Sequence, residues 1–175
     1  MKKRLILDFD GTLVEFKPVE RLDELLTPGY FSKLFVFENV VLAIQELYKR
    51  HPEIDILIGS KVLDAPHIPK DKDVIIDKHL PFINRENRIY IPYDAKKTDY
   101  IQITSCDYVL DDLTKNLVEV EESGGHGIKL LNGINANKRT WKGPAVHKDY
   151  PYTLIVEQLE IYMNLKEKKN EMEKV

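Results

Sequence analysis

The feature that most constrains the fold is a regular alternation of short apolar runs with amphipathic segments. The apolar runs lie at residues 5–7, 54–58, 89–91, 108–110 and 128–131. Runs of this length, ended by polar residues or glycine, are typical of buried parallel strands. Between them, apolar residues recur with helical spacing near residues 38–50, 70–80 and 115–123, and a Gly-Gly pair follows the third segment as a helix C-cap does. This order predicts a three-layer α/β/α sandwich around a mostly parallel, five-stranded, Rossmann-like sheet.

Two further segments complete the expected domain plan. Residues 15–37 contain two prolines, a glycine and several aromatic side chains, which indicates a small cap insertion that packs over the domain. Residues 152–165 have the pattern of a closing helix, and the mostly charged tail at 166–175 is expected to fray. Because 175 residues suffice for one core and are few for two, we expect a single domain over residues 1–165.

Composition excludes several classes of function. The 26 Lys and Arg residues nearly balance the 29 Asp and Glu residues, giving a net charge of −3, which disfavours binding of a nucleic-acid polymer. The single cysteine cannot form an intramolecular disulfide. No apolar run approaches the roughly 20 residues that span a bilayer, and Asp8 interrupts the first run too early for a signal peptide. We therefore expect a cytoplasmic protein without a membrane partner, and the sequence indicates no particular oligomeric state.

The first apolar run ends in the most informative motif, Asp8-Phe9-Asp10-Gly11-Thr12. In an open α/β sheet, ligands bind beyond the carboxyl ends of the strands, and this strand delivers two carboxylates there. Such close like charges repel, and a hard divalent cation is the usual means of keeping both ionised. Gly11 permits a tight turn, and the Thr12 hydroxyl can bond locally to the backbone. The alternative is an ordinary surface turn, since Asp and Gly both favour turns.

A second apolar run also ends in two acids, Asp111 and Asp112. Asp112 has an alternative explanation, because a helix that begins near Thr114 would favour an acid at its N-terminus. This explanation applies less clearly to Asp111. Two strands of one sheet that both end in carboxylates indicate a shared cation, so we predict a Mg²⁺ site with Asp8 and Asp111 as ligands.

These motifs resemble those of the haloacid dehalogenase-like (HAD) superfamily of phosphotransferases. The superfamily's first motif is matched in full from Asp8 to Thr12, and its fourth motif is matched by Asp111 and Asp112. The resemblance implies that Asp8 is a nucleophile that takes up the phosphoryl group as an aspartyl-phosphate, and that Asp10 acts as general acid and then as general base. It also implies that Mg²⁺ is bound by Asp8, by Asp111 and by the main-chain carbonyl of Asp10, with Asp112 at or next to the metal shell.

The two remaining superfamily motifs are shorter. The second is a Ser or Thr that ends a strand, and Ser60 stands in that place after the run at 54–58. The third is a lysine that neutralises the nucleophile and the phosphate; we assign it to Lys72, with Lys70 and Lys61 as alternatives. Taken alone, such a serine is more often part of a turn and such lysines are more often solvated. The phosphate-binding residues that the resemblance implies are Ser60, Lys72, Gly11 and Thr12.

Within the superfamily, the chain resembles the 5'(3')-deoxyribonucleotidase family, including its short bacterial and phage members, up to about residue 147. The resemblance rests on residues 8–16, 28–34, 71–78 and 108–112, and on residues 127–135 with Trp141. It implies the dephosphorylation of nucleoside monophosphates, with Phe16 in the substrate pocket.

The chain departs from that family at three places. Gly59-Ser60 stands where the better-known nucleotidases have Thr-Ser, Ile75 stands where Trp is common, and the insertion is much shorter than a helical cap. Two alternatives therefore stay open: a HAD phosphatase for a sugar phosphate or another small metabolite, and a non-catalytic HAD protein that binds phosphate.

Overall fold

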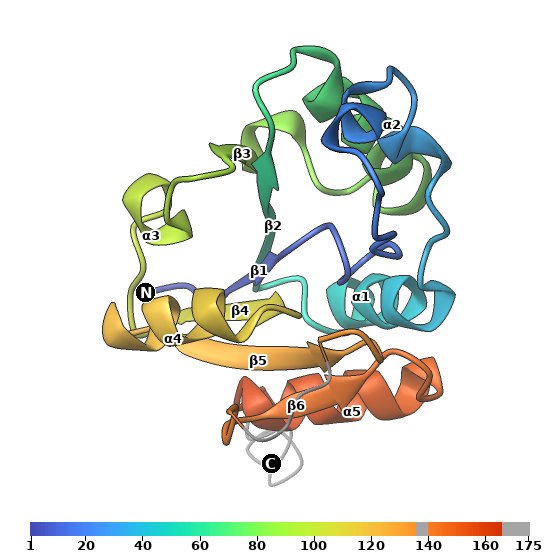
Figure 1. Ribbon diagram of the computed structural model, residues 1–175. Helices are drawn as coiled ribbons and strands as arrows, with labels where there is room; N and C mark the ends of the chain where they lie inside the picture. Colours follow the sequence, from blue (N-terminus) through green and yellow to red (C-terminus); the bar gives the residue numbers. More distant parts are fainter. Residues whose placement is uncertain (136–139, 166–175) are drawn as a thin grey trace, which may run out of the picture.

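The computed structural model, which describes residues 1–135 and 140–165, contains a fully parallel sheet with the strand order β3-β2-β1-β4-β5-β6 (Figure 1). The first strand, β1, lies in the interior of the sheet with β2 on one side and β4 on the other. The carboxyl ends of β1 and β4 are therefore neighbours. The strands are β1 (Arg4–Leu7), β2 (Asp55–Val62), β3 (Arg88–Pro92), β4 (Asp107–Asp111), β5 (His126–Leu131) and β6 (Ala145–His147).

The sheet has six strands, so the predicted number of five is wrong. The additional strand, β6, pairs with β5 in parallel, with Lys129 opposite Ala145 and Leu131 opposite His147. It has only three residues, of which Val146 alone is fully buried. A strand this short at the edge of a sheet has no periodic pattern that a sequence could reveal.

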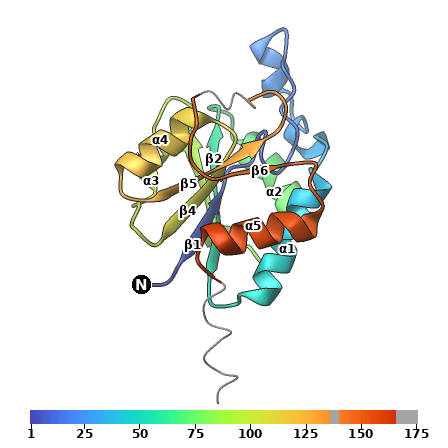
Figure 2. The same cartoon turned by 90° about the horizontal axis from the view of Figure 1, so that it is seen from below.

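Helices cover both faces of the sheet, as the three-layer prediction requires. Figure 2 shows α3 and α4 on one side of the strands and α1, α2 and α5 on the other. The helix at 38–50 is confirmed at its predicted bounds, whereas the second helix begins earlier and the last ends earlier than predicted. The helices are α1 (Glu38–Arg50), α2 (His67–His79), α3 (Lys97–Tyr100), α4 (Thr114–Glu122) and α5 (Tyr152–Tyr162).

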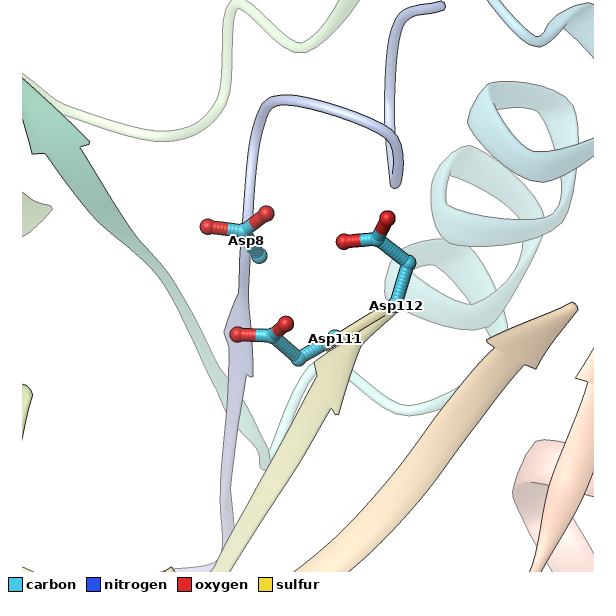
Figure 3. A group of neighbouring side chains, drawn as sticks. All are labelled: Asp8, Asp111 and Asp112. Carbon is cyan, nitrogen blue, oxygen red and sulfur yellow. The ribbon is translucent and has the colours of Figure 1, made fainter. Parts of the chain in front are cut away.

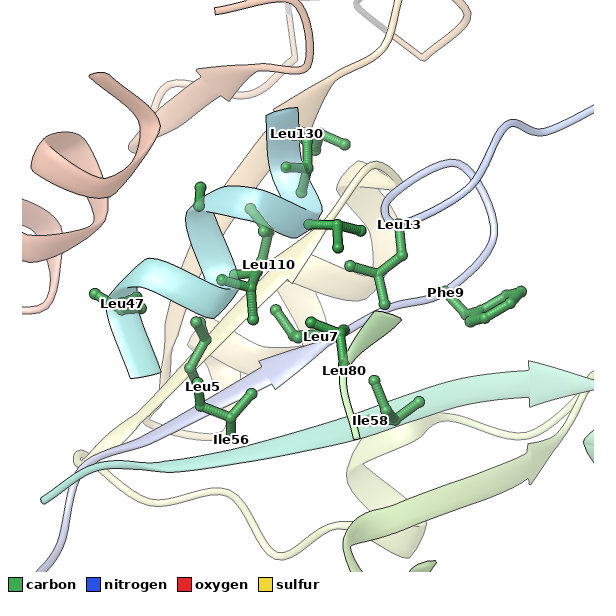
Figure 4. Close-up of a cluster of buried hydrophobic side chains, with 14 of the residues drawn as sticks. Leu5, Leu7, Phe9, Leu13, Leu47, Ile56, Ile58, Leu80, Leu110 and Leu130 are labelled. Carbon is green, nitrogen blue, oxygen red and sulfur yellow. The ribbon is translucent and has the colours of Figure 1, made fainter. Parts of the chain in front are cut away.

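The two faces of the sheet form two hydrophobic clusters. Leu5 and Leu7 point into the larger cluster, against α1 (Figure 4), while Ile6 points into the smaller one with Leu117 of α4. Since successive side chains of a strand point to opposite faces, a central strand covered on both sides must be apolar throughout. This explains the continuous apolar run of β1 and fixes the position of the acids that follow it.

The segment at 15–37 connects the loop after β1 to α1. Its two ends are held together by a bridge between Val14 and Val36, and it contains the short 3-10 helices η1 (Leu22–Leu26) and η2 (Phe31–Lys33). Phe31 is buried in the larger cluster, and the Gly29 amide donates a hydrogen bond to the Asp71 carboxylate of α2 at 2.7 Å. The insertion is thus attached to α2.

Two further expectations concern the C-terminal tail and membrane-spanning helices. The tail predicted to fray, 166–175, lies outside them. Within residues 1–135 and 140–165, no helix combines the length and the apolar character needed to cross a bilayer.

Candidate active site

The loop after β1 holds two acids in a tight turn. The amides of Leu13 and Val14 both donate to the Phe9 carbonyl, at 2.9 and 3.2 Å, and the Gly11 amide donates to the Val14 carbonyl at 2.8 Å. Gly11 has a φ of +75°, and a Cβ at this position would collide with the Asp112 carboxylate. Only glycine therefore allows the loop to approach the end of β4 this closely.

Three carboxylates meet at the carboxyl ends of β1 and β4. Asp8 follows β1, Asp111 is the last residue of β4, and Asp112 comes next (Figure 3). One oxygen from each lies within 4.8 Å of the others, and all three residues are buried. The sequence predicted that Asp8 and Asp111 would lie together, and the structure brings Asp112 into the same group.

Burial has a clear electrostatic effect on this acidic group. Loss of solvent raises the pKa of Asp8 to about 8; Lys97 opposes this rise, and the charges of Asp111, Asp112 and Asp10 add to it. Burial and the charge of Asp111 raise the pKa of Asp112 to about 6. Several buried carboxylates stay ionised together only if cations balance them.

Lys97 supplies one such cation, and the sequence did not identify it. Its Nζ donates to Asp8 Oδ1 at 2.6 Å and to Asp111 Oδ2 at 2.7 Å, and only 2% of the residue is exposed. Burial alone would lower the pKa of Lys97, but the charges of Asp111 and Asp8 outweigh burial and raise it. The lysine side chain therefore stays charged beside the predicted nucleophile.

The path of the chain between β3 and β4 could have indicated that Lys97 lies near the acids. The chain must return from β3, at one edge, to β4, on the far side of β1, and so passes β2 and β1. Lys97 opens α3 within this connection. A lysine in this connection can therefore reach the carboxyl end of β1. Sequence spacing alone does not distinguish Lys97 from the other lysines of the chain.

Lys97 contacts two of the three carboxylates, and a second buried lysine, Lys129, is near enough to feel the charges of Asp111 and Asp112 but donates to Thr114 Oγ1. The carboxylate oxygens of the group suit a divalent cation. All three acids offer the hard oxygen ligands that Mg²⁺ prefers, so the residues fit the predicted metal. The Asp10 carboxylate is not part of this group. Its predicted contribution through the main-chain carbonyl stays a prediction.

Asparagine side chains fix two of the acids. Asn132 and Asn135 donate through their Nδ2 atoms to Asp112 Oδ2, at 2.8 and 2.6 Å, and Asn132 also reaches the Gly11 carbonyl at 2.9 Å. Asn116 Nδ2 donates to Asp111 Oδ2 at 2.9 Å. The N-terminus of α4 does not hold the Asp112 carboxylate, since the Leu113 amide donates to Asp111 Oδ1 instead.

The hydrogen bonds of the predicted third-motif lysine, Lys72, go to Asp10 and to the end of β2. Lys72 Nζ donates to Asp10 Oδ2, to Ser60 Oγ at 2.9 Å and to the Lys61 carbonyl at 3.1 Å. Its alternatives do not enter this cluster with their charged groups: Lys70 is exposed, and Lys61 contributes its carbonyl oxygen. Lys97 therefore contacts Asp8 and Asp111, whereas Lys72 contacts Asp10.

The remaining residues that the sequence singled out are Thr12, Phe16 and Trp141. Thr12 is buried, and its Oγ1 has no hydrogen-bond partner among the described residues. Phe16 is 44% exposed at the start of the insertion. Trp141 is buried, packs on Gly127 and donates from Nε1 to the Pro144 carbonyl, so it is a packing residue of the smaller cluster.

Comparison with known proteins identifies the fold. No protein-family model matches the sequence, and no curated protein matches it. Solved structures do match: the D,D-heptose 1,7-bisphosphate phosphatase from Burkholderia thailandensis is 13% identical, with a TM-score of 0.57, over 90% of this chain and 99% of that one.

Two further solved structures are also similar in fold to this chain. The D,D-heptose 1,7-bisphosphate phosphatase from B. bronchiseptica, complexed with magnesium and phosphate, is 11% identical with a TM-score of 0.60, over 90% of this chain and 97% of that one. A hydrolase from Pseudomonas syringae is 15% identical with a TM-score of 0.55, over 92% and 99% of the two chains. The chain therefore has the three-layer α/β fold that these phosphatases and this hydrolase adopt.

Proposed function

We propose that the protein is a magnesium-dependent phosphomonoesterase of the HAD superfamily that works through an aspartyl-phosphate on Asp8. The observation that carries the proposal is the position of Asp8: it lies within a buried acidic group that fits Mg²⁺, and its carboxylate is paired with Lys97. The fold shared with two bisphosphate phosphatases and a hydrolase supports the same reaction class.

Each step of this reaction has a side chain of suitable chemistry. The Asp8 carboxylate attacks phosphorus and displaces the leaving oxygen, which takes a proton from Asp10. Asp10, now ionised, then accepts a proton from the water that hydrolyses the acyl phosphate. Lys97 holds Asp8 in place through a charged hydrogen bond of 2.6 Å. When bound, Mg²⁺ would offset the negative charge of a phosphate dianion approaching this carboxylate.

We further propose a nucleoside monophosphate as the substrate. The support is the resemblance to 5'(3')-deoxyribonucleotidases at residues 8–16, 28–34 and 71–78, together with an exposed Phe16 that a base could stack on. On this proposal the protein acts in the cytoplasm on a small phosphomonoester.

A sugar phosphate is the second candidate, and a specific observation favours it. Two of the solved structures that share the fold are phosphatases of a heptose bisphosphate. The insertion at 15–37 is also short, with only two 3-10 helices, and so offers little surface to select a base.

Phosphate release from a matched panel separates these candidates. The panel contains 5'- and 3'-deoxyribonucleotides, ribonucleotides and sugar phosphates, each with Mg²⁺ at the same concentration. A preference for deoxyribonucleotides supports the nucleotidase proposal, and a preference for sugar phosphates supports the alternative. The absence of turnover with every substrate would contradict the enzymatic proposal and favour a non-catalytic phosphate-binding protein.

A further inference from the structure

Lys72 is a fully buried lysine whose place in the fold differs from that of Lys97. It lies in α2, has no exposed surface, and its Nζ has three acceptors: Asp10 Oδ2, Ser60 Oγ and the Lys61 carbonyl. An ammonium group has three donors, so these partners use all of its hydrogen-bonding capacity. None of the hydrogen bonds between described residues joins Lys72 to Asp8.

Two aromatic rings enclose this ammonium group. Nζ lies 5.0 Å from the centroid of the Phe9 ring and 4.8 Å from that of Phe31. Both distances allow a cation–π attraction, and both rings are buried and so keep water away. Since solvent cannot replace the Asp10 carboxylate as a partner for this charge, the pair has a strong preference for one geometry.

The insertion at 15–37 contributes to this enclosure. Phe31 belongs to η2, and the preceding Gly29 amide is hydrogen-bonded to Asp71, the neighbour of Lys72 in α2. Phe9 lies between Asp8 and Asp10 in the loop after β1. The side chain of Asp10 keeps 24% of its surface exposed, so its carboxylate is held at one end and open to a ligand.

We propose that Lys72 is a positioning residue for Asp10, held in place by Phe9 and Phe31. This rests on the proposed function, in which Asp10 transfers a proton to the leaving oxygen and later takes one from water. Lys72 donates a hydrogen bond and does not itself transfer a proton. Proton transfer requires the carboxylate to lie within hydrogen-bond reach of the reacting oxygen, so an Asp10 free to rotate would be a poor acid and base.

The kinetic test compares Lys72→Met with Lys78→Met, an exposed position on the same helix. Methionine suits the space between two rings, so the variant should fold. With phenyl phosphate, we expect kcat of Lys72→Met to fall by about 100-fold, KM and inhibition by inorganic phosphate to change little, and Lys78→Met to behave as the unmodified protein. A rise in KM and weaker inhibition by phosphate, without loss of kcat, would overturn the proposal in favour of direct phosphate binding.

The double variant tests whether Lys72 acts through Asp10. If it does, adding Lys72→Met to Asp10→Asn should lower kcat by less than about 3-fold further, because the acid that Lys72 positions is already lost. Losses that multiply in the double variant would show an independent action of Lys72 and would overturn the proposal.

A structural measurement keeps the test independent of turnover. Crystal structures of the unmodified protein and of Lys72→Met should show the Asp10 carboxylate in one position in the former and displaced or spread in the latter. A carboxylate that stays within about 0.5 Å in both would overturn the proposal, because positioning at an active site requires about that precision. If no phosphomonoester is hydrolysed by the unmodified protein, the proposed function fails while this comparison still decides the role of Lys72.

Discussion

Among single residues, Lys97 has a prominent role, because its ammonium group partly balances the negative charge of the buried carboxylates. It is the one ammonium group that contacts two of the three clustered carboxylates among the described residues, Asp8 and Asp111. Removing one partner of a buried ion pair leaves the other charge uncompensated. Lys97 is therefore expected to matter for stability as well as for turnover.

We predict that Lys97→Met lowers the free energy of unfolding by about 3 kcal/mol in EDTA, because it leaves Asp8 and Asp111 buried without their cation. Urea unfolding measures the effect. The control is Lys96→Met, an exposed neighbour whose loss should cost less than about 0.5 kcal/mol. Equal stability of the two variants would contradict the assigned role of Lys97.

The proposed role of Asp10 as an acid predicts a dependence on the leaving group. Asp10→Asn should lower kcat for an alkyl phosphate by about 10²- to 10⁴-fold, because the departing alkoxide needs a proton. The first step with p-nitrophenyl phosphate should suffer less, since p-nitrophenolate leaves without protonation. Rapid mixing with each substrate resolves that step, and equal losses for both would argue against acid catalysis by Asp10.

Local sequence patterns locate the clustered acids but not the lysines that pair with them. The proximity of Asp8 and Asp111 could be predicted, because strands followed by acids bring carboxylates together at the carboxyl end of a parallel sheet. Lys97 and Lys72 could not be distinguished in this way, since a lysine's role depends on which acid the folded backbone brings near it. The structure places Lys97 on Asp8 and Lys72 on Asp10, a division that spacing along the chain does not contain.

At the scale of elements, long and strongly patterned segments were predictable and short ones were not. The strand β1 and the helix α1 have apolar patterns that local reasoning can read, and both are confirmed. The strand β6 and the helix α3 have three and four residues, too few for a period to show. Both form because neighbouring elements fix the chain there.

The ring of Trp141 packs closely on Gly127 of β5. A Cβ added at Gly127 would lie 2.7 Å from Cη2 of Trp141, so Gly127→Ala should reduce the free energy of unfolding by about 1–3 kcal/mol. Chemical denaturation measures the loss. In a Trp141→Leu background the same substitution should cost less, because the colliding ring is gone; an unchanged cost would show that this contact does not limit the space at Gly127.

In the molecule as a whole, the buried acids make stability depend on pH. The pKa of Asp8 is raised to about 8 and that of Asp112 to about 6, against an ordinary value of 3.8. At pH values between 3.8 and about 8, these two groups therefore bind more protons in the folded protein than in the unfolded chain. By linkage, these two groups make the metal-free protein less stable as pH rises through that range.

Magnesium should reverse this trend, because it competes with the same protons. We predict that Mg²⁺ raises Tm more at a pH of about 8.5 than at about 5.5, where protons occupy Asp8 and Asp112. Thermal unfolding with Mg²⁺ and with EDTA at each pH gives the two shifts. Asp111→Asn, as the control, should diminish both shifts; a shift that is the same at the two pH values in the unmodified protein would speak against competition at this site.

Phosphate release from p-nitrophenyl phosphate is the measurement that decides whether Asp8 takes up the phosphoryl group in a magnesium-dependent reaction. The unmodified protein should turn over this substrate with Mg²⁺, and both EDTA and Asp8→Asn should reduce turnover by at least about 1,000-fold. Turnover that survives in Asp8→Asn or in EDTA would contradict the claim.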